Sequence, residues 1–491
     1  MESAYVIGLD QSTQGTKAVL LDETGSILEK AFMEHKQIIS PGGWVSHDGE
    51  EIYTNCLRVI EDLLRKAQVP AEKIRALGIS NQRETTIAWD RETGESAAPA
   101  IVWQCARAKE ITDGFRDPVF LEKVRYATGI PLSPYFPAAK AAWLLRHSLQ
   151  VRELAEKGRL CLGTMDSFLV FKMTGGKIFR TDFSNASRTQ LFNLHTLTWD
   201  KELCRAFGIP GEALPEVEYS DGDFGATDLE GLLPFPVPIR GVMGDSHAAL
   251  FGQGCTEPGM AKVTYGTGSS IMMNIGDRFK ESMNGLATSL AWGRGGRVSY
   301  VLEGNINYAG AVITWMQKDL GLFENARETS SMAREANSAD RTCLVPAFSG
   351  LGAPYWRDGA CAILSGMSRT TGRKEIVKAG LCSIAFQVTD IVKAMSGDAL
   401  LPLSELRADG GPTANDFLMQ FQSDIACVKL KVREAPELSA MGAAFMAGIE
   451  QGVYKEEILR EDRHIKTYFP AMTDREREEK YRNWKQAVEK A

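Results

Sequence analysis

The sequence predicts an α/β protein made of two domains that enclose one site. At 491 residues the chain is too long for a single hydrophobic core, so two domains of a few hundred residues each are expected. Short apolar runs of strand length alternate with longer segments of helical periodicity. A unit of strand, polar loop and strand near the start is repeated in outline just past the middle of the chain. This repeat indicates duplicated domains, with residues 1–252 in one and residues 253–491 in the other.

Composition restricts the class of protein. The chain is 44% hydrophobic and 24% charged, as in ordinary globular enzymes, and its formal net charge of -7 argues against nucleic acid as a partner. Its nine cysteines are scattered without a C-x-x-C pair, which is typical of reduced thiols in a cytoplasmic protein. The N-terminus lacks the basic and apolar regions of a signal peptide, and no apolar run reaches the length of a membrane span. We therefore expect a cytoplasmic location and no membrane partner.

The first polar loop lies between two apolar strand segments, Tyr5–Leu9 and Lys17–Leu21. Its residues, Asp10–Thr16, offer hydroxyl groups and unhindered backbone amides that can bind an anion, and Asp10 at the strand end can hold a hydrated Mg²⁺ ion. An ordinary polar hairpin loop would have the same composition. After a turn, a third strand is expected over Ser26–Phe32.

The following elements carry further candidate side chains. A helix is expected over Asp48–Gln68, and a buried strand, Ile74–Ser80, runs into Asn81–Thr86. There, Arg83 and Glu84 can bind a polyhydroxylated ligand with donors and acceptors together, although a surface ion pair would look the same.

Aromatic residues follow in the next elements. A short strand is expected over Ala100–Trp103 and a helix over Lys140–His147. Trp103 and Tyr135 are of a type that packs in cores more often than it lines ligands.

A single carboxylate stands at the junction of the two halves. The apolar run Val237–Met243 ends in a turn of small residues that places Asp245 ahead of a helical segment, Ala248–Phe251. A catalytic base would occupy such a position. The alternative is that Asp245 only caps the helix with its side-chain oxygen.

The second polar loop, Gly266–Ser270, lies between strand segments Ala261–Tyr265 and Ile271–Ile275. Two loops of hydroxyl groups and glycine, each opening a domain, favour one phosphate chain held between them. Further along, a strand at Leu403–Ala408 leads into Asp409–Asn415, whose glycine pair lets the backbone approach a ligand closely. Thr473 begins a C-terminal helix with a capping box.

These segments together resemble the FGGY carbohydrate kinases, and within them most closely the glycerol kinases. The resemblance runs from about Tyr5 to Trp484, in the family's order and spacing, and rests on Asp10–Thr13, Asn81–Thr86, Ile101–Cys105, Tyr135 with Lys140 and Trp143, Gly244–Asp245, Tyr265–Gly268, Gly350–Trp356, and Asp409–Gly411 with Asn415. It implies an α/β architecture of two actin-like (ribonuclease H-like) domains that close on ATP, Mg²⁺ and a small polyol or sugar. It also implies a homodimer or homotetramer.

The resemblance assigns a role to each matching residue. Asp245 corresponds to the catalytic base, and Asp10 and Asp245 to the carboxylates on the magnesium side. The acceptor-binding positions are Arg83, Glu84, Trp103, Tyr135, Asp245, Ser246 and Ser270. The nucleotide-binding positions are Thr13, Lys17, Gly266, Thr267, Gly310, Thr314, Gly411 and Asn415.

Several residues depart from the glycerol kinase pattern. Ser246 stands where those kinases have glutamine, and Ser270 where they have phenylalanine. Both changes replace a larger side chain by a small hydroxyl, so the acceptor pocket is expected to be roomier and more polar than glycerol needs, and His247 could add a donor. Thr314 replaces a glutamine and Cys382 replaces an acid.

The resulting hypothesis is ATP-dependent phosphorylation of a terminal hydroxyl of glycerol or a related polyol or sugar. A ketopentose kinase of the xylulose or ribulose type is the alternative, favoured by Ser246 and disfavoured by the retained Arg83, Glu84 and Trp103. A catalytically silent actin-like nucleotide-binding protein is a further alternative, against which the retention of Asp10 and Asp245 argues.

Overall fold

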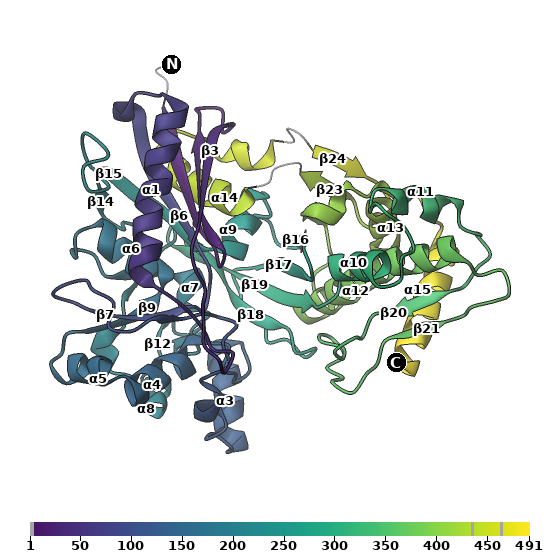
Figure 1. Cartoon of the computed structure of the whole chain (residues 1–491), viewed down its shortest axis with the longest axis horizontal. Helices are drawn as coiled ribbons and strands as arrows, with labels where there is room; N and C mark the ends of the chain where they lie inside the picture. Colours follow the sequence, from purple (N-terminus) through teal and green to yellow (C-terminus); the bar gives the residue numbers. More distant parts are fainter. Residues whose placement is uncertain (1–3, 434–436, 462–464) are drawn as a thin grey trace.

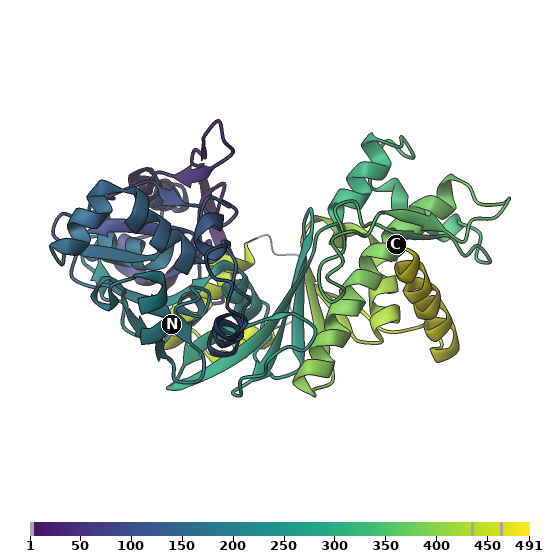
Figure 2. The same cartoon turned by 90° about the horizontal axis from the view of Figure 1, so that it is seen from below.

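The computed structural model describes residues 4–433, 437–461 and 465–491. The chain forms two halves, each organised around one large mixed sheet, and both views show the purple-to-teal N-terminal half beside the largely green C-terminal half (Figures 1 and 2). The predicted α/β class is therefore confirmed.

The N-terminal sheet begins with three antiparallel strands, and two parallel strands then extend it from the first. Its spatial order is β14 (Ala226–Thr227), β15 (Val237–Gly244), β6 (Ile74–Asn81), β1 (Tyr5–Gln11), β2 (Gly15–Leu21) and β3 (Ile27–Glu34). A second, smaller sheet has the order β4 (Ile38–Ile39), β5 (Val45–His47), β8 (Ala100–Ile101), β7 (Thr86–Asp90) and β9 (Leu160–Thr164).

The C-terminal sheet repeats this plan. Its order is β18 (Ala287–Arg294), β19 (Arg297–Ile306), β17 (Ser269–Gly276), β16 (Met260–Tyr265), β22 (Glu405–Asp409), β23 (Leu430–Arg433) and β24 (Ile465–Tyr468). As in the first half, antiparallel strands come first, and the strands that follow a long connection join parallel to the first strand. In both halves the first hairpin loop therefore lies beside the carboxyl end of a parallel strand, where open α/β sheets usually bind ligands.

Helices cover the sheets of each half. Those of the N-terminal half are α1 (Gly49–Ala67), α2 (Lys109–Thr112), α3 (Pro118–Thr128), α4 (Pro137–His147), α5 (Leu149–Glu156), α6 (Met165–Met173), α7 (Phe183–Ala186), α8 (Lys201–Phe207) and α9 (Asp245–Gly252). Those that follow are α10 (Gly310–Lys318), α11 (Glu328–Glu335), α12 (Arg373–Ala399), α13 (Asp416–Ala426), α14 (Leu438–Glu450) and α15 (Asp474–Lys490). Short strand pairs complete the fold: β10 (Arg180–Asp182) with β13 (Glu216–Glu218), β11 (Phe192–Asn193) with β12 (Thr198–Trp199), and β20 (Cys343–Val345) with β21 (Ile363–Ser365). Within the described residues, no helix has both the length and the apolarity that a membrane crossing requires.

Helix α14 belongs to the C-terminal part of the sequence but packs on the N-terminal sheet (Figure 1). It lies over three neighbouring strands, each of which contributes a glycine at the contact: Gly8 on β1, Gly78 on β6 and Gly241 on β15. A Cβ atom at any of these glycines would collide with a carbonyl oxygen of Ala440 or Ala443 on α14. The glycines therefore let the helix backbone approach the sheet closely.

Both predicted polar loops are too long: β1 extends to Gln11 and β2 begins at Gly15, and the error in the second loop affects the site. The second polar loop is shorter than expected, because Gly266 N donates to Gly268 O over 2.8 Å and closes the hairpin at Gly268. Ser270 therefore lies in strand β17, opposite Thr264 on one side and Asn305 on the other.

Candidate active site

A cavity of about 640 Å³ lies between the two halves and is lined by both. The N-terminal half contributes two carboxylates, Asp10 at the end of β1 and Asp245 at the start of α9. The other lining residues include Ser12, Lys17, Ser246, Lys262, Thr264, Ser270, Asp409, Gly410, Gly411 and Glu437. The predicted site between two duplicated domains thus corresponds to a single cavity.

Asp245 is oriented by its neighbours and keeps one oxygen open. Its Oδ1 accepts hydrogen bonds from Arg83 Nε (3.1 Å) and from the backbone N of Ser246 (2.6 Å). No described residue donates to Oδ2. Gly244, and not Asp245, is the N-cap of α9, so the interpretation of Asp245 as a mere helix cap is not supported. The free oxygen can therefore accept a proton from a bound hydroxyl.

Arg83 connects Asp245 to a buried charge network. Its guanidinium binds both carboxylate oxygens of Glu303 on β19, at 2.9 and 3.0 Å, and donates to Ser246 Oγ at 3.2 Å. Burial alone would raise the pKa of Glu303, but Arg83 and Arg188 outweigh it and hold that pKa far below its usual range. Glu303 therefore stays ionised, and Arg83, fixed in a bidentate pair, holds Asp245 in one orientation.

The predicted acceptor residue Glu84 joins the same network. Arg188 Nε donates to Glu84 Oε1 over 2.6 Å, and Arg188 Nη1 lies 3.0 Å from Glu303. The backbone of Glu84 has a φ of 58°, a left-handed conformation that is rare outside glycine and that occurs at functional sites. Arg83, Glu84, Asp245 and Ser246 are thus brought together, as expected.

Lys140 connects the backbones of three predicted acceptor residues. This buried ammonium donates to the carbonyl oxygens of Glu84 (3.0 Å), Trp103 (3.1 Å) and Tyr135. Burial lowers its pKa to about 7. The rings of Trp103 and Tyr135 meet edge to face with centroids 5.7 Å apart. Through one side chain, three predicted acceptor residues far apart in sequence are held at fixed positions.

Asp10 and Asp245 form a carboxylate pair that suits a divalent cation. Asp10 is buried and accepts a hydrogen bond from Ser80 Oγ at 2.8 Å. Burial, and then the nearby Asp245 carboxylate, raise the pKa of Asp10 to about 7. Mg²⁺ usually takes only one or two protein carboxylates and completes its shell with water and substrate phosphates, so this pair beside an open cavity fits it. Accordingly, the described part of the chain holds no cluster of three or more His, Cys, Asp or Glu ligands.

The first polar loop lies at the edge of this cavity. Ser12 and Lys17 line it, and Lys17 pairs with Glu437 at 3.2 Å. Thr13, a predicted phosphate contact, has its hydroxyl bonded instead by the indole N–H of Trp103 at 2.8 Å. The loop is therefore hydrogen-bonded to Trp103, a predicted acceptor residue, and the contact of Thr13 with nucleotide remains a prediction.

The predicted nucleotide loops of the second half meet one another. Gly310 N donates to Gly266 O (2.9 Å), and Ala309 N and Ala311 N donate to Thr267 O. A Cβ at Gly410 would collide with the backbone of Tyr265. The β16–β17 loop, the start of α10 and the turn after β22 therefore form one surface of glycine and backbone amides.

The remaining two nucleotide candidates have internal partners. Thr314 is exposed and its hydroxyl bonds to Gly310 O at 3.2 Å. Asn415 caps α13 by accepting from Leu418 N (3.0 Å) and donates to Thr329 Oγ1 (2.8 Å). Their nucleotide contacts also remain predictions.

We expect Gly310→Ala to weaken nucleotide binding selectively. The added Cβ would lie 2.7 Å from Gly266 O, so the second phosphate loop must shift. The expected result is a KM for ATP raised by about tenfold, with a stability loss of about 1–3 kcal/mol typical of overpacking. Steady-state kinetics with ATP and acceptor varied separately measures it, with Gly397→Ala on α12 as control, because Gly397 is exposed, lies outside the cavity and has no atom near an added Cβ. An equal rise in the acceptor KM would contradict this assignment.

His247 does not extend into the cavity as a second base. It is fully buried, and its Nε2 lies 3.2 Å from Ser289 Oγ on β18. Burial, and then the positive charge of Arg83, hold the pKa of His247 well below its usual value. A neutral histidine at this position joins the two halves structurally.

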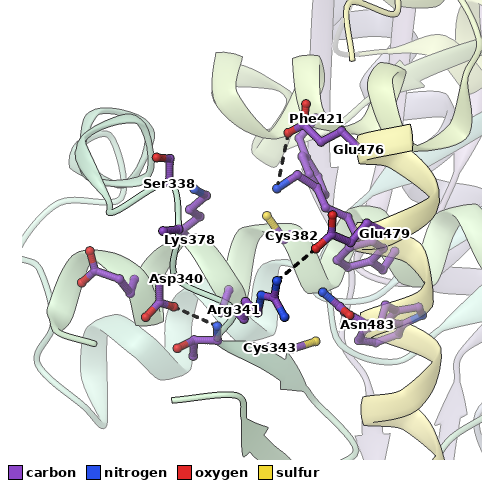
Figure 3. Close-up of a pocket in the computed structure, with 17 residues that line it drawn as sticks. Ser338, Asp340, Arg341, Cys343, Lys378, Cys382, Phe421, Glu476, Glu479 and Asn483 are labelled. Atoms are coloured by element: carbon purple, nitrogen blue, oxygen red, sulfur yellow. Dashed lines mark hydrogen bonds and ion pairs between the residues drawn. The ribbon is translucent and has the colours of Figure 1, made fainter. Parts of the chain in front are cut away.

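A second cavity, of about 330 Å³, lies in the C-terminal half between α12, α13 and α15 (Figure 3). It shares no residue with the cavity that holds Asp10 and Asp245. Arg341 pairs there with Glu479, and Lys480 with Glu476. Cys382 lies in its wall, where burial raises the pKa of the thiol to about 12. The predicted catalytic and acceptor residues lie outside this cavity, so we place the active site between the halves.

Sequence reasoning missed several residues of the site. Glu303, Arg188 and Lys262 are buried charges there, and Thr264 lines the cavity. The available signal was an acid inside an apolar strand, because Glu303 directly follows Val301 and Leu302. A buried acid of this kind requires a partner.

Two family models match the chain, one in each half. A model described as the N-terminal domain of the FGGY family of carbohydrate kinases matches residues 5–252, and the corresponding C-terminal domain model matches residues 261–450.

Individual relatives agree over the full length. The chain is 44% identical to a glycerol kinase of Carboxydothermus hydrogenoformans, covering 100% of this chain and 99% of the relative. It is 43% identical to one of Xanthomonas campestris, covering 100% and 98%. The structure superposes on that of Plasmodium falciparum glycerol kinase with ADP, with a TM-score of 0.93 and 34% identity, covering 99% and 98%. A gluconate kinase of Lactobacillus acidophilus has the same fold, with a TM-score of 0.87 at 22% identity, covering 100% of this chain and 98% of that one.

Proposed function

Because this chain belongs to the FGGY family of carbohydrate kinases, we propose that it transfers the γ-phosphoryl group of ATP to a terminal hydroxyl of glycerol or a related polyol. The observation that carries the proposal is the state of Asp245. One of its oxygens is held by Arg83, and the other is open in the cavity that also holds Asp10.

The reaction needs positioning and charge neutralisation more than covalent help from the protein. In the proposed mechanism, Asp245 Oδ2 accepts a hydrogen bond from the attacking hydroxyl and takes its proton as the bond to phosphorus forms. Arg83 keeps the carboxylate oriented because Glu303 holds its guanidinium by two bonds. Trp103 and Tyr135 supply an apolar wall for the acceptor carbons.

The phosphoryl donor is ATP with Mg²⁺. Asp10 and Asp245 would hold the ion, which neutralises phosphate charge when bound. Backbone amides and hydroxyl groups of the two loops, with Lys17, would bind the phosphate oxygens. Closure of the two halves would exclude water, a competing acceptor.

The test is Mg·ATP-dependent phosphorylation across glycerol, erythritol, the pentitols, dihydroxyacetone, xylulose and ribulose. We expect turnover with at least one polyol, and loss of turnover when EDTA removes the magnesium. A preference for xylulose or ribulose would support the ketopentose alternative. Nucleotide binding without turnover of any acceptor would support the silent actin-like alternative and overturn this proposal.

Other features of the proposal follow from the family and from composition. We infer a cytoplasmic enzyme, a homodimer or homotetramer, in which residues 1–252 carry the acceptor side and residues 253–491 the nucleotide side. Light scattering of the purified protein measures the oligomeric state, and a monomer at working concentration would contradict it.

A further inference from the structure

A row of polar side chains crosses the C-terminal sheet on the side that faces the N-terminal half. Strand pairing places Asp409 of β22 opposite Thr264 of β16, Thr264 opposite Ser270 of β17, and Ser270 opposite Asn305 of β19. Directly paired residues share one face of a sheet, so these four side chains lie on the same face. Thr264, Ser270 and Asp409 line the cavity between the halves.

This row runs beside the acceptor machinery. Asn305 lies two residues after Glu303 on β19, and alternate residues of a strand share a face about 7 Å apart. Glu303 holds Arg83, and Arg83 holds Asp245 and Ser246. Ser270 and Asn305 therefore lie two residues farther along their strands than the level of Glu303, which holds Arg83 against Asp245.

Ser270 and Asn305, at one end of this row, make no side-chain hydrogen bond to any described residue. Ser270 Oγ is buried without a hydrogen bond to any described residue. The Asn305 side chain is exposed and likewise makes no hydrogen bond within residues 4–433, 437–461 and 465–491. A buried hydroxyl without a partner is unfavourable, and a ligand hydroxyl that bonds to it would remove that cost.

Glycerol does not supply that partner. In the proposed function, the reacting hydroxyl of glycerol faces Asp245, and the acceptor positions Arg83 and Glu84 belong to the same half of the chain, whereas Ser270 lies on the opposite sheet. The phenylalanine of the glycerol kinases would fill the space beside Asn305, whereas Ser270 leaves it open and polar. An acceptor with one or two further hydroxylated carbons fills the space and satisfies both side chains.

We propose that Ser270 and Asn305 form a subsite for the hydroxyls beyond the third carbon of the acceptor, and that the preferred substrate is a four- or five-carbon polyol. The inference rests on the proposed function and names its substrate class. Ser246 also lines the cavity. Its short side chain accepts a hydrogen bond from Arg83 Nη2 and leaves more space than the glutamine of the glycerol kinases would.

The experiment compares kcat/KM for erythritol, ribitol, xylitol and arabitol with kcat/KM for glycerol. We expect the best of the longer polyols to exceed glycerol by about tenfold or more, the scale of one additional net hydrogen bond. Ser270→Phe should reverse this preference by blocking the subsite. Asn305→Ala should lower the ratio of longer polyol to glycerol by about tenfold. Arg297→Ala, an exposed change at the other end of β19, is the matched control and should leave the ratio unchanged.

The outcomes separate the two proposals. The subsite is overturned if the wild-type enzyme prefers glycerol and neither Ser270→Phe nor Asn305→Ala changes the ratio of kcat/KM for the longer polyol to that for glycerol. The proposed kinase activity would still stand in that case. Equal losses for all acceptors in Asn305→Ala also overturn it, because they show a structural role. Absence of phosphorylation with every acceptor overturns both proposals.

Discussion

Replacing Asp245 by asparagine is expected to lower kcat by about 10²–10⁴-fold, the usual contribution of a positioned general base. Asparagine keeps the size of the side chain and can still accept from Arg83 and Ser246 N through its amide oxygen. It cannot take the proton of the attacking hydroxyl at the position of Oδ2. Acceptor binding should change much less, so the loss falls on kcat rather than on KM.

Steady-state kinetics and thermal unfolding of Asp245→Asn together test this assignment. Asp277→Asn, an exposed acid next to the end of β17 and outside the cavity, is the matched control and should retain wild-type turnover. Turnover of Asp245→Asn within a few-fold of wild type would show that another group accepts the proton.

Replacing Glu303 by glutamine is expected to destabilise the fold by about 3–5 kcal/mol and to raise the acceptor KM. The change leaves Arg83 and Arg188 buried without their shared negative partner, which is the costly way to break a buried pair. Arg83 then loses the two bonds that hold it against Asp245. Denaturant unfolding measures the stability loss, and initial rates at varied acceptor measure the binding loss.

The stability effect of Glu303→Gln has a defined pH dependence. The pKa of Glu303 is depressed in the folded state, so its carboxylate stabilises the fold above the unfolded value of about 4.3. That contribution is lost as pH falls toward the folded value. The free-energy difference between wild type and variant should therefore be constant above about pH 5 and shrink below it. A difference that grows on acidification would contradict the assignment.

Glu405→Gln provides a matched control for binding. Glu405 is also a buried acid of the C-terminal sheet, paired with Arg407 and Lys429, but it lies outside the cavity between the halves. The variant Glu405→Gln should lower the free energy of unfolding without raising the acceptor KM. If both variants raise that KM equally, the effect of Glu303 is indirect.

Much of the architecture could be predicted because its signals are local. The helix expected over Asp48–Gln68 is α1, with Asp48 as its N-cap, and Thr473 caps α15 through Glu476 N as its sequence indicated. The two polar loops between apolar strands were recognisable from composition alone. Asp10, Asp245, Ser246 and Ser270 indeed share one cavity.

The rest depended on contacts between distant residues. Nothing near Glu303 indicates that Arg83, 220 residues away, is its partner. The sequence around Lys140 predicts only a helix packed on a core. The structure shows that Lys140 donates to the backbone carbonyls of three predicted acceptor residues. Ser270 was expected in a loop, since a single sequence does not reveal that the hairpin closes at Gly268. That error hid its pairing with Asn305.

Helix α14 has a consequence for how the protein is made. The glycines of β1, β6 and β15 contact α14 residues near Ala440 and Ala443, more than 400 residues after Gly8 in the chain. A nascent chain that has emerged as far as Gly252 therefore has every strand of its first large sheet but not the helix that seals one side. Contacts this distant in sequence form late and slow folding. The α14 side of the first sheet is therefore uncovered until most of the chain has been synthesised, and its packing is a late step of folding.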